Sequence, residues 1–176
     1  LRNGPMTSSR KSALAPGARN DYQHRCRSGP ELEETPMKDA LTIYQYHLDS
    51  VSQLIWDRDF EGVTALMTYP HELATARGVT VVDRPETMVD WAREFRAHLD
   101  QLGATSYHRV AVAAAISGED ESEISGFHRV YVLSGATHLI DPYISEATLK
   151  LCDGVWLGSG VRAVLRSTRY PVDDEA

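Results

Sequence analysis

The stretch Gly126-Phe127-His128-Arg129-Val130-Tyr131-Val132-Leu133, closed by Ser134-Gly135, decides the fold that the sequence predicts. Its side chains alternate between two sets: His128, Val130 and Val132 on one side, and Phe127, Arg129, Tyr131 and Leu133 on the other. Because both sets contain large apolar groups, we expect a long central strand with neither face open to water. Helices and a pocket would cover one face, and a second copy of the protein would cover the other.

The two-residue period of this strand continues through the second half of the chain. Strands are predicted at 106–116, 123–133, 143–151 and 154–166, with a turn at each junction. The strand at 106–116 is again apolar or small on both sides, which supports a sheet covered twice. Its two sets are Val110, Val112 and Ala114, and Ala111, Ala113 and Ala115.

Before residue 103 the period is helical. Apolar spacing predicts a helix of about five turns from Thr35-Pro36 to Ile55, a short helix from Phe60 to Met67 and a hairpin over 72–82. A third helix starts near Pro85 and ends at Gly103. Its apolar stripe consists of Met88, Trp91, Ala92, Phe95, Leu99 and Leu102. Three helices followed by an antiparallel meander indicate an α+β fold.

Composition sets the broad class. The 176 residues are 42% hydrophobic and 24% charged, which suits one globular domain. Residues 37–176 carry twelve Lys and Arg against twenty-one Asp and Glu, and an acidic body without a basic stripe argues against nucleic-acid binding. The chain has no apolar run of membrane-spanning length and no block typical of a secretory signal, so we expect a cytoplasmic protein without a membrane contact.

Three regions divide the chain. Residues 1–36 are rich in Gly, Pro, Ser and basic residues and lack hydrophobic clusters, so we expect a disordered tail or an upstream extension. Residues 37–168 would form the single domain, and residues 169–176 a C-terminal tail.

This order of elements carries a family resemblance. The helix with Trp91 after a hairpin, the turn Asp153-Gly154-Val155-Trp156 into the last strand, and the run from Gly126 to Lys150 resemble the nuclear transport factor two-like superfamily, also called cystatin-like or SnoaL-like. The resemblance spans about Lys38 to Arg166. Within it, the chain is similar to small bacterial members of unassigned function.

The resemblance implies a cone. A strongly bent antiparallel (mixed) sheet would wrap around three N-terminal helices, with a hydrophobic pocket at the open end and a homodimer through the convex sheet face. The superfamily includes ketosteroid-isomerase-like, scytalone-dehydratase-like and polyketide-cyclase enzymes and noncatalytic association domains, and fold alone does not choose among them.

This chain lacks the two carboxyl groups that ketosteroid-isomerase-like catalysis needs. These are a carboxylate base and a neutral carboxylic acid, and the resemblance places Ala74 and Ala147 at those positions. Glu72 and Glu146 are the nearest alternatives. The dehydratase pattern needs a tyrosine and an aspartate late in the first helix, where this chain has Ile55-Trp56 with Asp57 one step away.

Histidines are the candidates for acid–base catalysis. We predict that His128 and His108 carry any proton transfer, because imidazoles titrate near neutral pH and both, with His71, fall on or near strands of one cavity. Exposed or hydrogen-bonded strand histidines are the alternative. A metal site built from His71, His108, His128 and Asp141 is a further alternative, but no HxH or HxxxH spacing supports it. We therefore expect no metal and no organic cofactor.

The predicted pocket lining is mostly aromatic, as ligand sites usually are. The set comprises Tyr44, Trp56, His71, Trp91, Phe95, Tyr131, Asp141 and Tyr143.

Two functions follow from these features. The first is a small-molecule binding domain for a hydrophobic ligand, with isomerase, cyclase or dehydratase activity left open. The second is a noncatalytic dimeric association or ligand-sensing domain, which predicts an interior filled by its own side chains. The face of the strand at 126–133 that lines the pocket is also open. The side with His128 is our prediction, and the side with Arg129 and Tyr131 is the alternative.

Overall fold

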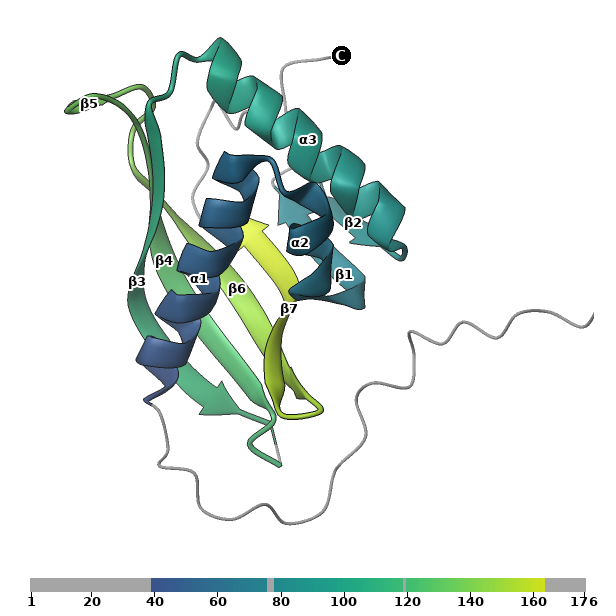
Figure 1. Cartoon of the computed structure of the whole chain (residues 1–176). Coiled ribbons are helices and arrows are strands. Elements are labelled where there is room, and N and C mark those ends of the chain that lie inside the picture. Colours follow the sequence, from purple (N-terminus) through teal and green to yellow (C-terminus); the bar gives the residue numbers. More distant parts are fainter. Residues whose placement is uncertain (1–38, 76–77, 119, 164–176) are drawn as a thin grey trace, which may run out of the picture.

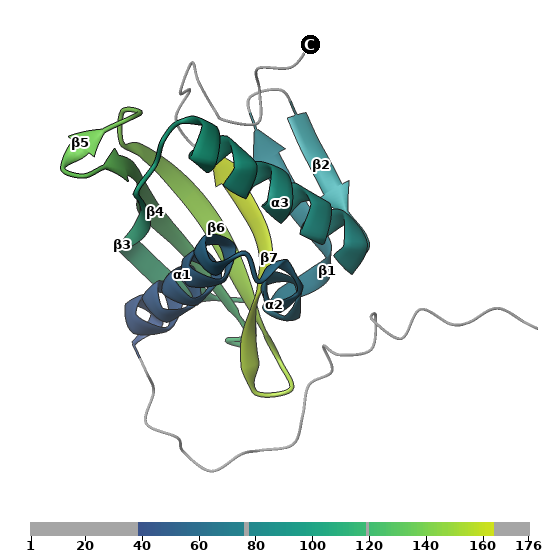
Figure 2. The ribbon, with the colours of Figure 1, turned by 45° about the horizontal axis from the view of Figure 1, so that its top comes forward.

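The structure, a computed structural model, describes residues 39–75, 78–118 and 120–163. The predicted tails over residues 1–36 and 169–176 lie outside these residues. Three helices and seven strands make up the described part, in the α+β order that the sequence predicts. Figure 1 shows the three helices on one face of a curved sheet, and the turned view in Figure 2 shows α1 and α3 on that same face.

The helices follow the predicted apolar stripes. Their bounds are α1 Ala40–Asp57, α2 Phe60–Ala65 and α3 Pro85–Gln101. In α1, the buried residues Tyr44, Leu48, Val51 and Ile55 recur every three or four positions, so one side of the helix faces the sheet. In α3, Pro85 occupies the first turn, where its missing N–H costs nothing, and the following Gly103 has a φ of 72°.

The sheet is mixed. Its strands are β1 Met67–Thr75, β2 Gly78–Val82, β3 Ser106–Ser117, β4 Glu123–Ser134, β5 Thr137–His138, β6 Tyr143–Cys152 and β7 Val155–Ala163. They are ordered β2-β1-β7-β6-β4-β3, and β5 pairs with β4. The predicted meander is present as β3-β4-β6-β7, whereas β1 lies parallel to β7. Met67, predicted to end the second helix, instead begins β1.

The central strand β4 has the predicted parity. His128, Val130 and Val132 are buried on the side that faces the helices, whereas Phe127 and Arg129 are exposed on the outer face. In β3 the simple alternation does not hold, because the register shifts between Ala111 and Ala113. At this bulge two consecutive residues, Val112 and Ala113, are exposed, so Ala114 lies on the side opposite to Val110 and Val112.

Two buried clusters form the core. The larger joins α1, α2 and α3 around Val51, Met88 and Phe95, and the smaller joins α1 to β4 and β6 around Tyr44 and Leu48. Gly126 permits the second contact, since a Cβ atom there would lie 2.7 Å from the Tyr44 ring. Within the described ranges, none of the helices has the length and apolar character that crossing a membrane requires.

Candidate functional site

The interior, by which we mean the space between the helices and the inner face of the sheet, contains a hollow of about 40 Å³. Apolar side chains from all three helices and from the sheet form most of its wall, including Val51, Val63, Met88, Trp91 and Val130. The polar side chains in the wall are His71, Tyr107, Arg109, His128, Tyr143 and Ser145. A volume of this size holds about one water-sized group, so the interior is largely filled by its own side chains.

His128 is held by Tyr44. The Tyr44 hydroxyl lies 2.7 Å from Nδ1 of His128, donates to the Gly126 carbonyl at 2.7 Å and accepts from the Ala147 N–H at 3.1 Å. A hydroxyl has one proton, so its donation to Gly126 makes Nδ1–H of His128 the donor in the remaining contact. Both side chains are fully buried. The arrangement joins α1 to β4 and β6, and it is a structural role for His128.

Two further histidines are buried near the same hollow. Nδ1 of His71 donates to the Gly158 carbonyl at 3.1 Å, which leaves Nε2 as the acceptor of a neutral ring. His47, on α1, is 7% exposed and lies against Gly158, where an added Cβ would be 3.0 Å from its Nε2.

All three buried histidines are neutral near pH 7. Burial lowers the pKa of His71 to about 4, and the pKa values of His47 and His128 to about 3. The positive charge of Arg109 adds to the lowering of the pKa at His47 and His128. General acid–base catalysis near neutral pH works best with a pKa close to 7, so these rings are poorly matched to that role.

Arg109 is the functional candidate that the sequence reasoning missed. It lies on the inner side of β3, where its Nε donates to Ser52 Oγ at 2.9 Å and its Nη2 to the Leu48 carbonyl at 3.0 Å. Tyr107, two residues earlier, is on the same side and also lines the hollow. The strand alternation that puts Tyr107 and Arg109 inside puts His108 outside, where it is exposed. His108 and His128 therefore do not share a cavity, contrary to expectation.

Three of the predicted aromatic residues line the hollow. Trp91 and Phe95 stack on each other from α3, with ring centroids 5.5 Å apart and planes 2° apart, and Tyr143 enters from β6. His71 also lines it, from β1. Tyr44 lies outside the wall, in the smaller core cluster.

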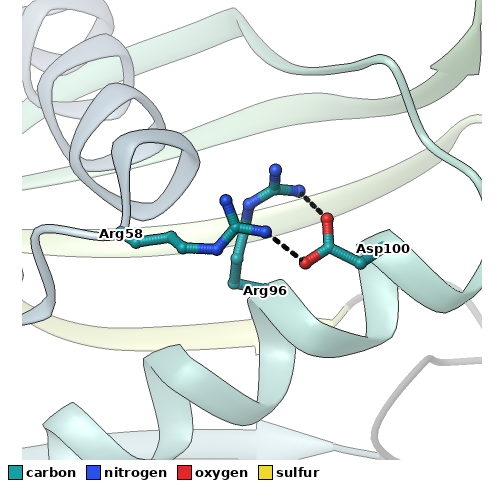
Figure 3. Close-up of polar contacts among 3 residues, drawn as sticks. All are labelled: Arg58, Arg96 and Asp100. Carbon is teal, nitrogen blue, oxygen red and sulfur yellow. Dashed lines mark hydrogen bonds and ion pairs between the residues drawn. The ribbon is translucent and has the colours of Figure 1, made fainter.

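Trp56 packs between helices. The guanidinium carbon of Arg96 lies 4.0 Å from the centroid of its ring, so Trp56 provides a cation–π contact to α3. Arg96 and Arg58 both pair with Asp100, at 2.9 Å and 2.7 Å, as Figure 3 shows. This network ties the end of α1 to the end of α3 beside the interior.

The remaining predicted residues lie elsewhere. Tyr131 is on the outer face of β4, where its ring is 5.9 Å from that of His138. Asp141 is exposed between β5 and β6. Glu72 is exposed on β1, and Glu146 belongs to the outer parity of β6, so neither carboxylate is placed in the interior. Among residues 39–75, 78–118 and 120–163, no group of three His, Cys, Asp or Glu side chains lies close enough to hold a metal ion.

A larger hollow of about 820 Å³ lies outside the interior, as an open groove. Its wall comes from α2, the start of β1 and parts of β6 and β7, with Thr64, Tyr69, Lys150 and Leu157 among the residues. None of the predicted catalytic or pocket residues lines it, although Glu72 does. We place the candidate site in the smaller hollow, because the buried polar groups converge there.

Comparisons with known proteins identify the fold. No protein-family model matches the chain, and no curated protein matches it. Solved structures do. The protein Aln2 from a Streptomyces species has a TM-score of 0.56 at 20% identity, over 73% of this chain and 92% of that one. A cystatin-like domain of unknown function from Nostoc punctiforme has a TM-score of 0.54 at 12% identity, over 74% of this chain and 80% of that one.

A third match has the same fold. An NTF2-like protein with a cystatin-like fold from Novosphingobium aromaticivorans has a TM-score of 0.50 at 12% identity, over 74% of this chain and 84% of that one. At these identities the likeness concerns the fold alone. The predicted nuclear transport factor two-like, cystatin-like fold is thereby confirmed.

Proposed function

From this fold we propose that the chain is a noncatalytic domain that binds a small, largely apolar ligand in its interior and pairs with a second copy of itself. The observation that carries the proposal is the composition of the interior wall. Apolar side chains surround a few buried polar groups around one hollow, which is the usual make-up of a small-ligand site.

The absence of an acid–base couple favours binding over catalysis. In the described part of the chain, no carboxylate forms a hydrogen bond or ion pair with His47, His71 or His128. The contact that His128 does make, with Tyr44, serves the packing of α1 on the sheet. Of the two functions that the sequence left open, this geometry therefore supports the ligand-sensing domain better than the isomerase, cyclase or dehydratase.

The size of the hollow restricts the ligand. At about 40 Å³ it accepts one small group as it stands. A ligand of several heavy atoms has to displace part of the wall, and unbranched Met67 and Met88 are the most adaptable residues there. We expect weak binding of small apolar molecules, strengthened when they fit without moving Trp91.

Ligand-observed NMR with neutral probes such as phenol, indole and benzyl alcohol tests this function. The matched variants are Leu73→Phe, in the wall of the hollow, and Val81→Phe, exposed on the adjacent strand β2. We expect probes to bind the native protein, to bind Leu73→Phe about tenfold more weakly or worse, and to bind Val81→Phe unchanged. If no probe binds, or if Leu73→Phe binds them as well as the native protein, the proposal is wrong.

The homodimer is proposed on the outer face of the sheet. Val110, Val112 and Phe127 are 47%, 57% and 42% exposed on adjacent strands. Arg129 is the cross-strand partner of Val110, and Glu146 is that of Phe127. An exposed apolar patch with a charged margin is typical of a protein interface. Light scattering at micromolar concentration should give a dimer for the native protein and a monomer for Phe127→Asp. Val79→Asp, on β2 at the far edge of the sheet, is the control and should stay dimeric.

A further inference from the structure

The guanidinium of Arg109 is the one permanent charge among the described residues that line the hollow. Its Nε donates a hydrogen bond to Ser52 Oγ, and its Nη2 donates one to the Leu48 carbonyl. Its Nη1 forms no hydrogen bond with a described residue. An arginine has five N–H donors in a rigid fork, so part of that fork is available to a ligand.

No negative charge balances this cation. Arg109 forms no ion pair with a carboxylate in the ranges 39–75, 78–118 and 120–163, and the described wall of the hollow includes no Asp or Glu. The titratable groups nearby include Tyr44, Tyr107 and the three buried histidines, and these are neutral at pH 7. Two hydrogen bonds and the Tyr107 ring, whose centroid lies 5.9 Å from the guanidinium carbon, replace part of the hydration of this half-buried cation, but no described countercharge does.

The arginine is also fixed in place. Besides the two side-chain bonds to α1, the Arg109 carbonyl accepts from Gln45 Nε2 at 2.9 Å, and Gln45 Oε1 accepts from the Ala111 N–H at 2.7 Å. The backbone of β3 and the guanidinium are thus both anchored to one helix. A cation held in this way before a ligand arrives loses little side-chain entropy on binding.

We infer that the hollow, when the adaptable Met67 or Met88 side chain in its wall moves aside, binds a small monocarboxylate, with the carboxylate paired to Arg109 and the apolar tail against Trp91 and Phe95. This inference rests on the proposed binding function and names its ligand class. A planar carboxylate matches the guanidinium fork, and the surrounding wall of valine, isoleucine, methionine and aromatic side chains suits a short hydrocarbon tail. A second charge on the ligand would find no described cation in that wall.

Butyrate and butyramide, which have nearly the same shape and differ in charge, test the inference on the native protein. Isothermal titration or ¹H–¹⁵N shift mapping is run at constant ionic strength set with NaCl. We expect butyrate to bind about tenfold more tightly than butyramide, or better. Equal affinity for the two probes overturns the inference, and so does competition by chloride strong enough to abolish the preference.

Two arginine variants separate this site from general surface charge. Arg109→Gln should remove the preference for butyrate while leaving the affinity for butyramide, and Arg109→Lys should keep part of it. Arg84→Gln, at a position 73% exposed just before α3, is the matched control and should change neither affinity. A preference that survives Arg109→Gln in a folded variant contradicts the assignment. If Arg109→Gln does not fold, the ratio of the affinities of the native protein for butyrate and butyramide tests the inference by itself.

The outcomes also distinguish the two proposals. If phenol or indole binds but butyrate binds no more tightly than butyramide, the monocarboxylate inference is wrong and the ligand-binding function still stands. Failure of every neutral and charged probe would refute both.

Discussion

The phenol oxygen of Tyr44 and Nδ1 of His128 lie 2.7 Å apart, across 84 residues of sequence. Their contact joins the first helix to the centre of the sheet, and the same hydroxyl also satisfies the Gly126 carbonyl and the Ala147 N–H. A histidine that the sequence offers as a proton carrier is therefore part of the core.

Tyr44→Phe should destabilise the protein by about 1–3 kcal/mol, because it removes a buried hydroxyl and leaves its partners unpaired. Tyr46→Phe, two residues away on the same helix, is the control. Tyr46 is 76% exposed, so its substitution should change stability by less than about 0.5 kcal/mol. Urea unfolding of the two variants measures the difference, and equal stabilities would show that the Tyr44 contact contributes little.

Acid should destabilise the fold through the buried histidines. Their folded pKa values of about 3 to 4 lie below the unfolded value of 6.5, so the unfolded state takes up protons first as the pH falls. The stabilisation is present above pH 6.5 and is lost as the pH falls toward 4. Each histidine should cost about 2 kcal/mol between pH 7 and pH 5.

Urea midpoints at pH 7, 6 and 5 measure this dependence. His128→Gln should make the loss of stability between pH 7 and 5 smaller by about one third, since it removes one of three similar groups. His108→Gln should leave the dependence unchanged, because His108 is exposed. A native protein equally stable at pH 7 and 5 would contradict the assignment of neutral, buried rings.

Gly126→Ala should destabilise by about 1–3 kcal/mol through overpacking. The added Cβ would lie 2.7–2.8 Å from three atoms of the Tyr44 ring, which is fully buried and cannot move away easily. In a double-mutant cycle with Tyr44→Leu, the penalty for Gly126→Ala should shrink, because the ring it meets is gone. Strictly additive penalties would show that the two residues do not clash.

Asp100→Asn should cost more than Arg58→Gln. The side chain of Arg96 is only 8% exposed and would lose its countercharge, which we expect to cost about 1–3 kcal/mol. Arg58 is 57% exposed, so the loss of its pair with Asp100 should cost about 1 kcal/mol or less. Thermal or urea unfolding compares the two, and the reverse order would mean that Arg96 gains little from Asp100.

The fold could be predicted from the sequence because apolar residues recur at a clear helical or two-residue spacing along most of its segments. The helical stripes of α1 and α3 and the two-residue alternation of β4 are local signals, and both end in turn residues whose conformations are local too. The same alternation separates His128, Val130 and Val132 from Phe127, Arg129 and Tyr131, and the structure places the first set on the buried side.

The pairing of β1 with β7 was not predictable in this way. These strands lie near opposite ends of the domain's sequence and run parallel, and nothing in either segment specifies the other. Likewise, the bulge in β3 adds one residue without a sequence signal, since small or apolar residues occur both before and after it.

The sequence by itself determined the class of elements, their order and the two alternating sets of side chains on β4, because these depend on the spacing of apolar residues within one segment. Which of the two sets is buried under the helices was decided by the tertiary structure. Only the tertiary structure decided that Arg109 faces inward while His108 faces outward, that His128 is bonded to Tyr44 and that no described carboxylate reaches the interior. The physical reason is that a site consists of distances between side chains from different segments, and those distances are fixed only when α1 packs against β3 and β4.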